Sequence, residues 1–576
     1  MQPLSYDTLQ TNLESDRKFR ERRHSQWTDN YTLYRDTVIV NRLTQRQSVN
    51  VPLMKESMRT ILSGIDDPPD NYYENLDNDK QKELFMNEYW KWVFDMNKLE
   101  IKDIIDKKQV LLYGRSFIKL NIVNGQFYVE VLDPQDVLVD RYIDPSDIET
   151  ARRVIHTGIF SALSDVAQNP MYDQEAITKL KEFFATNAGL IKNEENTRIM
   201  QDKNQRMSDM GVPDANNPIL GETYVELNEH YVKVWDEEAK EDKIILCVTA
   251  EGQVLMQKPL KEVMNINFYP FVTWADDIER TDFWSDGWAD VARVPNQVLN
   301  VWLSQLVENR TLRNFGMNFY NSSIEGFNPT TYQPAPFGWY PIPAGKDGDI
   351  QKVLKRVEVP DLSESLDEMQ FLIGMVERST AATAIEKGES PEGQVTLGEV
   401  KLLDAKAQKR ITSMSKFYRQ VWKDLGDKFV MIVEANPDKL DAVKLYKKSV
   451  NGNYFAKELK PEDWKSKSGY KTRVTTLAEK EQDSIDSIQK MKIGVTEFPT
   501  NQPLREIYQK KILDWMGLSP DETKEVMEFE KQQVGMMQQM PGMPGQGLPG
   551  QGMPALPAPQ GVTLDQILTP PTQINA

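Results

Sequence analysis

The sequence has very few of the residues that build disulfides and zinc sites. Cys247 is the only cysteine, and the three histidines, His24, His156 and His230, lie far apart. One cysteine cannot form an intrachain disulfide, and so few ligands cannot complete a Cys/His zinc site. Cys247 lies in the apolar run 243–249, which predicts a buried strand and an unreactive core thiol; His156 and His230 also fall in predicted strands. We therefore expect no metal site and no cofactor.

Long apolar runs and catalytic motifs are also lacking. No apolar stretch reaches the roughly 18 residues of a membrane span, and the first residues lack the charged-then-apolar order of a signal peptide. The sequence thus predicts a protein of the cytosol, or of a particle assembled there. It contains no G-x-x-x-x-G-K-[ST], G-x-S-x-G or H-E-x-x-H motif. We predict that the chain is not an enzyme, with an unrecognised carboxylate site as the alternative.

Basic residues are in the minority, with 69 Lys and Arg against 87 Asp and Glu and a net charge of −18. Tight DNA binding depends on cationic side chains that release counterions from phosphates. The composition therefore argues against tight sequence-specific DNA binding, but it allows DNA to pass along a surface that does not hold it. One segment departs from this balance: residues 17–23 carry five positive charges within a helix predicted over 5–36. They indicate either a solvated helix face or a contact with nucleic acid or an acidic partner.

The first half of the chain predicts an α+β domain. Helical patterns around 84–94 and 101–112 precede two β-rich runs, 117–123 and 127–132. Asn124-Gly125 between them predicts a hairpin with a type I′ turn, because both residues tolerate positive φ. Further strands are expected at 152–160, 223–235, 243–249 and 253–257, and the polar residues 191–220 predict a long mobile insertion.

The second half predicts helices separated by one aromatic segment. A helix over 288–313 carries an apolar side made of Val291, Val294, Val298, Trp302 and Leu306, and Pro295 marks its first turn or a kink. Residues 314–350 combine many aromatics with Pro and Gly, which is typical of a small β or loop unit that packs against a neighbour. Another helix is expected from 362 to 383.

A break over 385–393 leads into a helix of about 38 residues, roughly 57 Å long, which is typical of an architectural strut. Strands at 454–459 and 470–476 and short helices to 535 follow. Eleven of the 20 residues in 541–560 are Pro or Gly, so the end of the chain cannot build a core.

Several motifs in this order resemble the portal protein family of tailed bacteriophages. Tyr113–Lys119 (YGRSFIK) followed by Val129–Asp136 (VEVLDPQD) is similar to the wing region of that family. Tyr269–Thr273, Phe283–Asp290 and Pro295–Asn300 resemble the start of its first stem helix. Ala382–Gly388 and Thr396–Glu399 resemble its tunnel loop and the start of its long helix. The likeness covers about residues 10–520 and is greatest to portals of short-tailed phages.

The resemblance implies an α+β portal fold that forms a ring. Its parts would be a mixed α/β wing (1–270, with a mobile insertion at about 191–220), the stem start and first stem helix (271–313), a small β or loop clip (314–360), a second stem helix (361–384), a tunnel loop (385–396), a long helix returning to the wing (397–480), a helical crown (481–535) and a disordered Pro, Gly, Met and Gln-rich tail (536–576). Some short-tailed phage portals extend the C-terminus into a long helical barrel, whereas here Pro and Gly intervene by residue 541.

The resemblance also implies a function and partners. Twelve copies would form a ring at one capsid vertex, the head–tail junction of the virion, after assembly in the host cytoplasm. Double-stranded DNA would pass through it non-specifically during packaging and ejection. The ring would bind the terminase large subunit, then head-completion or adaptor and tail proteins, and would contact major capsid and scaffold proteins but no membrane. The alternative is another oligomeric virion or scaffold component that never surrounds DNA.

Candidate site residues follow from this likeness and from charge. Residues 361–392 hold eight acidic and two basic residues, so a channel lined by them would repel DNA; solvated helix faces are the other interpretation. The candidates for the tunnel loop are Glu386, Lys387, Glu389 and Glu392. Those for the channel face of the stem are Gln297, Asn300, Gln305, Glu364 and Glu368. Those for contacts of the clip with a neighbouring subunit or the motor are Phe327, Trp339 and Tyr340.

Overall fold

The computed structural model describes residues 4–35, 40–41, 46–47, 49–65, 68–186, 224–237, 239–315, 318–320, 354–356, 365–380, 397–448 and 454–475. All of them fall in one unit, Met1–Gln482. The predictions for the insertion at 191–220, the break at 385–393, the short helices to 535 and the tail lie outside the described residues, as does nearly all of the aromatic segment 314–350.

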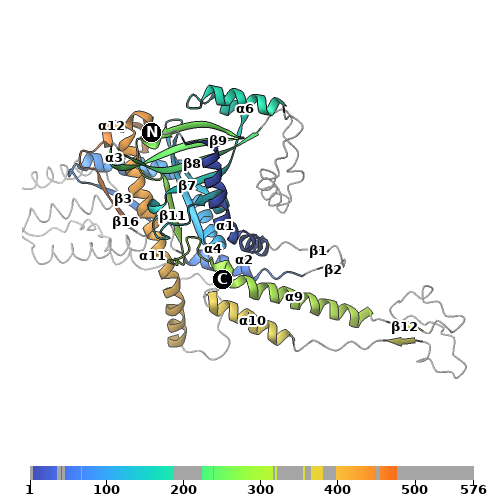
Figure 1. Cartoon of the computed structure of the whole chain (residues 1–576). Coiled ribbons are helices and arrows are strands. Elements are labelled where there is room, and N and C mark those ends of the chain that lie inside the picture. The colour runs from blue at the N-terminus through green and yellow to red at the C-terminus, as the bar shows by residue number, and fades with distance from the viewer. Residues whose placement is uncertain are drawn as a thin grey trace, which may run out of the picture. The chain divides into compact units, whose positions relative to one another are not determined.

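Two antiparallel sheets form the centre of the described fold (Figure 1). The smaller has the strand order β11-β4-β5 and the larger the order β10-β9-β8-β7-β6. Their bounds are β4 Arg115–Val123, β5 Gln126–Leu132, β6 Val137–Val139, β7 Arg153–Ala162, β8 Tyr224–Asp236, β9 Glu241–Ala250, β10 Gln253–Pro259 and β11 Phe271–Ala275. The predicted hairpin is confirmed: Asn124 and Gly125 have φ of 50° and 75° between β4 and β5.

Helices surround these sheets and contribute most of the aromatic core. They are α1 Tyr6–Arg35, α2 Leu53–Gly64, α3 Lys80–Met96, α4 Leu99–Tyr113, α5 Leu163–Gln168, α6 Gln174–Thr186, α8 Leu260–Met264, α9 Trp288–Phe315, α10 Ser365–Thr380, α11 Leu397–Ala435 and α12 Pro461–Trp464. Phe429 of α11 stands at the centre of one cluster, with its ring 4.8 Å from that of Trp90 and 4.9 Å from that of Phe127. The long helix α11 therefore contributes side chains to the hydrophobic core that it shares with α3 and β5.

Four two-stranded ribbons complete the described structure. The ribbon of β3 (Asp70–Asn75) and β16 (Tyr470–Thr475) pairs segments about 400 residues apart in the sequence. The others join β1 (Val40–Asn41) to β2 (Arg46–Gln47), β12 (Asn318–Tyr320) to β13 (Leu354–Arg356), and β14 (Val443–Lys448) to β15 (Tyr454–Leu459). The predicted strands at 454–459 and 470–476 are confirmed, whereas their partners β14 and β3 had not been foreseen.

Asparagine side chains cover two strand edges that would otherwise expose unpaired backbone groups. The Asn97 carboxamide accepts from Val129 N at 2.9 Å and donates to Phe127 O at 3.0 Å, as a neighbouring strand would. Asn87 does the same for the N–H and C=O of Tyr73, at 2.9 and 3.0 Å. Because open strand edges are templates for unwanted pairing, these side chains close β5 and β3 to further strands.

Candidate functional site

The helices predicted at 288–313 and from 362 to 383 are present and pack as a pair. α9 and α10 run side by side away from the two sheets (Figure 1). Leu299 of α9 and Met369 and Val376 of α10 are buried, and Trp302 and Leu306 are partly buried against the same core. Pro295 lies inside α9, beyond its first turn, and the helix continues through it. The part of the sequence expected to form two stem helices therefore forms a helical pair in the described chain.

The predicted apolar side of α9 is wrong in part. Trp302 and Leu306 face the core as expected, but Val291 and Val294 are about half exposed. The buried side instead carries Ala292, Asn296 and Leu299. The prediction combined residues from two adjacent apolar stripes, because residues in both stripes recur every three or four positions. Only the packing of α1, α2, α4 and α10 against α9 determines which stripe is buried.

Three of the candidate channel residues are exposed, and a fourth is engaged in a hydrogen bond within the chain. Gln297, Gln305 and Glu368 are exposed. Asn300 is only partly exposed, and its Oδ1 accepts from Val51 N at 2.8 Å; one turn later, the Ser304 hydroxyl accepts from Val49 N at 3.0 Å. Asn300 therefore holds the segment before α2 against α9.

The other candidates lie outside the described residues. They are Glu364, the tunnel-loop residues Glu386, Lys387, Glu389 and Glu392, and the clip residues Phe327, Trp339 and Tyr340.

Two glycines bring α4 and the start of α9 into backbone contact. Gly114 ends α4 with φ of +83°, and a Cβ there would stand 2.0 Å from Ser285 O. A Cβ on Gly287 would stand 2.7 Å from Gly114 N. Two motifs that had been recognised separately in the sequence, 113–119 and 283–290, thus meet at one point, and only glycine permits that approach.

Arg115 locks the same junction. It is 1% exposed; its Nε donates to Phe283 O at 2.8 Å and its Nη2 to Pro145 O at 2.9 Å, while its guanidinium lies 3.9 Å from the centre of the Phe283 ring. Burial lowers the pKa of Arg115 to about 9. The arginine is therefore a structural bridge between β4 and the segment that leads into α9.

The basic segment of α1 contacts acidic residues of its own chain. Arg23 Nη2 donates to Asp290 Oδ2 at 2.9 Å, and Arg23 also pairs with Asp286. Arg22 pairs with Asp282 at 3.0 Å, and Asn30 donates to Asp290 Oδ1 at 3.1 Å. The acidic contacts of these two arginines are thus with the chain's own segment 282–290, which leads into α9, and neither interpretation of the sequence had foreseen this.

Buried carboxylates tie α4 to α11. The Tyr418 hydroxyl donates to Asp103 Oδ1 at 2.5 Å, and Lys107 Nζ lies 2.7 Å from Asp103 Oδ2. Asp106 accepts from the Ser116 hydroxyl at 2.5 Å and from Trp274 Nε1 at 2.7 Å. This cluster joins α4, β4, β11 and α11, and no sequence motif had marked it.

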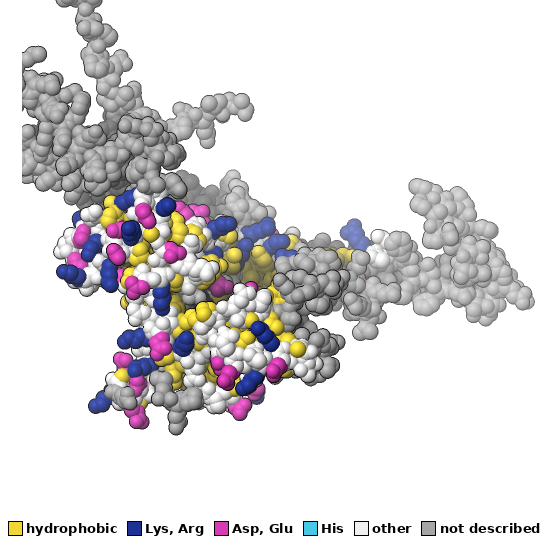
Figure 2. All heavy atoms as spheres, turned by 90° about the horizontal axis from the view of Figure 1, so that it is seen from above, with side chains coloured by type: hydrophobic (Ala, Val, Ile, Leu, Met, Phe, Trp, Pro, Cys, Tyr) yellow, Lys and Arg dark blue, Asp and Glu magenta, His cyan; other side chains and the backbone are white. Residues whose placement is uncertain are grey.

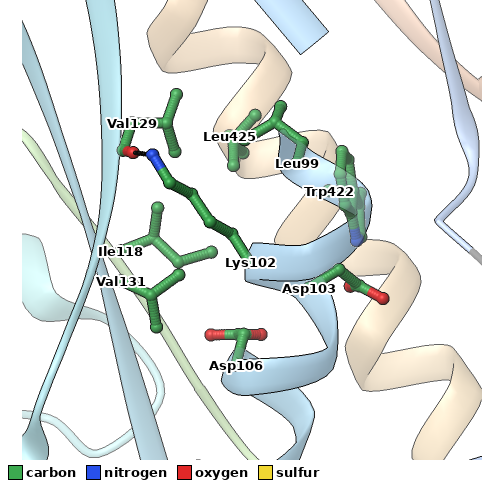
Figure 3. A pocket seen from close by; sticks show the side chains of 9 residues that line it. All are labelled: Leu99, Lys102, Asp103, Asp106, Ile118, Val129, Val131, Trp422 and Leu425. Carbon is green, nitrogen blue, oxygen red and sulfur yellow. Dashed lines mark hydrogen bonds between the residues drawn. The ribbon is translucent and has the colours of Figure 1, made fainter. Parts of the chain in front are cut away.

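A small pocket lies beside this cluster (Figure 3). Lys102 crosses it and donates to Val129 O. The lining residues are Leu99, Lys102, Asp103, Asp106, Ile118, Val129, Val131, Trp422 and Leu425. Burial raises the pKa of Asp103, and it raises the pKa of Asp106 to about 7. Most of this lining is apolar, and Asp103 and Asp106 have protein donors, so the arrangement fits an anchorage better than a catalytic site.

The described residues contain no group of three or more His, Cys, Asp or Glu side chains placed to hold a metal ion. Among the described helices, none combines the length and apolar character that a membrane crossing requires.

Comparison with known families decides the identity of the chain. The family model for the phage SU10 portal protein matches residues 38–516, well over half of the sequence. The chain belongs to this portal family. No curated protein matches it.

Family membership agrees with the described architecture of this portal chain. The chain is a phage portal protein of the short-tailed type, with an α+β body and a projecting helical pair. On the face drawn in Figure 2, acidic and basic side chains are interspersed over the body of the chain. The described residues of that face form no broad basic area of the kind that grips DNA.

Proposed function

We propose that this portal chain forms a ring of twelve copies at one capsid vertex, through which double-stranded DNA is packaged and ejected. The family match over residues 38–516 carries the proposal. The projecting pair of α9 and α10 supports it, because two packed helices that extend from the sheets provide a repeated wall element for a channel. The acidic composition supports passage of DNA without retention.

Each further part of the assembly belongs to the same proposal. The segment 385–396 forms the tunnel loop, with Glu386, Lys387, Glu389 and Glu392 toward the DNA. Gln297, Gln305, Glu364 and Glu368 face the channel, while Asn300 holds the residues before α2. The clip, with Phe327, Trp339 and Tyr340, contacts neighbouring subunits and docks the terminase, which adaptor and tail proteins later replace.

Native mass spectrometry and negative-stain microscopy of the purified full chain test the ring. We expect a closed oligomer with a central opening, with twelve copies as the expected mass. A stable monomer at micromolar concentration across several salt conditions contradicts the proposal. A closed oligomer without a central opening favours the alternative, a virion or scaffold component that does not surround DNA.

A further inference from the structure

The outward side of α9 carries a stripe of valines, and the described chain leaves three of the four about half exposed. Val291, Val294, Val298 and Val301 recur at alternating steps of three and four residues. Val291, Val294 and Val301 are 51%, 57% and 54% exposed. We call these four residues the valine stripe. The 3-4 spacing of β-branched residues is the pattern with which one helix packs along another.

α10 carries a second uncovered apolar stripe. Phe371 is 65% exposed and Met375, one turn later, is 48% exposed. Their buried counterparts on the same helix, Met369 and Val376, already face α9. The pair therefore satisfies its internal contact and still presents apolar side chains on both helices.

The two helices also carry opposite charge. α9 has three arginines against two acidic residues, and α10 has three acidic residues against one arginine. Contact between α9 of one copy and α10 of another joins opposite charges, whereas contact between two copies of α9 or two copies of α10 opposes like charges. The pairing is then head-to-tail, which closes into a ring when the rotation between copies permits.

From these observations we infer that a second copy of this chain covers the valine stripe, with Phe371 and Met375 of its α10 packed against α9. The inference rests on the proposed ring and specifies which surfaces meet in it. It also assigns these side chains to the boundary between subunits.

Cysteine cross-linking tests the contact, because the native Cys247 is fully buried. Chains with Val294→Cys are mixed with chains that carry Phe371→Cys, assembled, and treated with a short bismaleimide. Any product on a denaturing gel then joins two chains. We expect efficient linkage in the mixture and little in either variant alone. Gln370→Cys, at an exposed position on another side of α10 than Phe371, replaces Phe371→Cys in the control mixture and should link poorly.

The outcomes separate this inference from the proposed ring. Rings that form without linkage between positions 294 and 371 overturn the inference and leave the ring intact. Linkage of Val294→Cys only to itself overturns it in favour of a symmetric dimer contact. If no oligomer forms at all, the proposed ring itself fails.

A charge substitution gives a second measurement. Val301→Glu should weaken association between subunits about tenfold, since it places a carboxylate where the proposed contact would bury a valine. Gln370→Glu, off the Phe371 side of α10, should change it little, and the thermal unfolding of both variants should match the parent protein. Unaltered assembly of a folded Val301→Glu protein contradicts the inference.

Discussion

Single residues decide how the start of α9 is held. At Gly114 a positive φ coincides with a backbone approach so close that a Cβ would stand 2.0 Å from Ser285 O, so conformational freedom and space are both required. Arg115, the next residue, then fills the junction with a buried guanidinium. Such a site tolerates no side chain at one position and requires a long one at the next.

Replacing Gly114 with alanine should lower the free energy of unfolding by at least about 3 kcal/mol, because strain and a backbone clash add together. Gly252 is the matched control, with φ of +81° and nothing within 4 Å of its Cβ position. Gly252→Ala should cost only about 1 kcal/mol. Thermal unfolding of the two variants measures the difference, and equal melting temperatures would contradict the role of close approach.

Asp106 should make stability depend on pH. Burial raises its pKa to about 7 in the folded chain, whereas an unfolded aspartate titrates near about 3.9. Between these values the unfolded chain has lost the proton and the folded chain retains it, so stability falls as the pH rises from about 4 to about 7. The loss from this group is on the order of 4 kcal/mol at most.

Asp106→Asn should therefore reduce the fall in melting temperature between about pH 5 and pH 8. Asp438→Asn, at an exposed position, should keep the dependence of the parent protein. A differential scanning measurement at both pH values compares the three proteins. If the melting temperature of Asp106→Asn falls with pH as steeply as that of the parent protein, the Asp106 carboxyl does not titrate in this range.

At the scale of elements, α1 acts as a clamp on the first turn of α9. Arg23 is 12% exposed and its partner Asp290 is 9% exposed, while Arg22 is 53% exposed in its pair with Asp282. A buried pair leaves an uncompensated charge when one partner is removed, but an exposed pair does not. Removal of the Arg23 side chain should therefore destabilise the chain more than removal of the Arg22 side chain.

Arg23→Ala should cost about 2 kcal/mol and should increase amide hydrogen exchange over residues 288–300. Arg22→Ala, the control, should cost less than about 1 kcal/mol and leave that exchange unchanged. Mass-spectrometric hydrogen exchange on the full chain measures both. Similar protection in the two variants would mean that other contacts hold the base of α9.

At the scale of the whole molecule, charge governs the encounter with DNA. The chain has a net charge of −18, and acidic and basic side chains are interspersed over the described residues in Figure 2. The assembled protein should bind a short duplex at physiological salt with a Kd weaker than about 10 µM, because few counterions are released. Fluorescence anisotropy across a salt series measures both the affinity and its salt slope.

A charge reversal in the proposed tunnel loop sharpens this test. Glu386→Lys, Glu389→Lys and Glu392→Lys together should tighten binding and steepen its salt dependence. The control reverses three exposed acids elsewhere, Glu100→Lys, Glu241→Lys and Glu458→Lys, with the same change in net charge. Equal binding by the two triple variants would contradict the placement of the loop beside DNA.

Local patterns in the sequence determined most elements and the family. The hairpin at Asn124-Gly125, the helices α1, α9, α10 and α11 and the buried strand around Cys247 all follow from turn chemistry and periodicity, which depend on near neighbours. The ordered motifs between 113 and 399 predicted a portal protein, and the family match confirms it.

Tertiary structure alone decided which surfaces meet. No local pattern pairs β3 with β16, brings Gly114 to Ser285, or joins Asp103 to Tyr418, because each contact depends on packing between distant segments. The same reason explains the wrong side of α9: periodicity shows that a helix has apolar stripes, but only its neighbours determine which stripe is buried. The single cysteine excludes an intrachain disulfide, and the excess of acidic residues argues against tight DNA binding. Which residues touch one another depends instead on the packing of segments that are distant in the sequence.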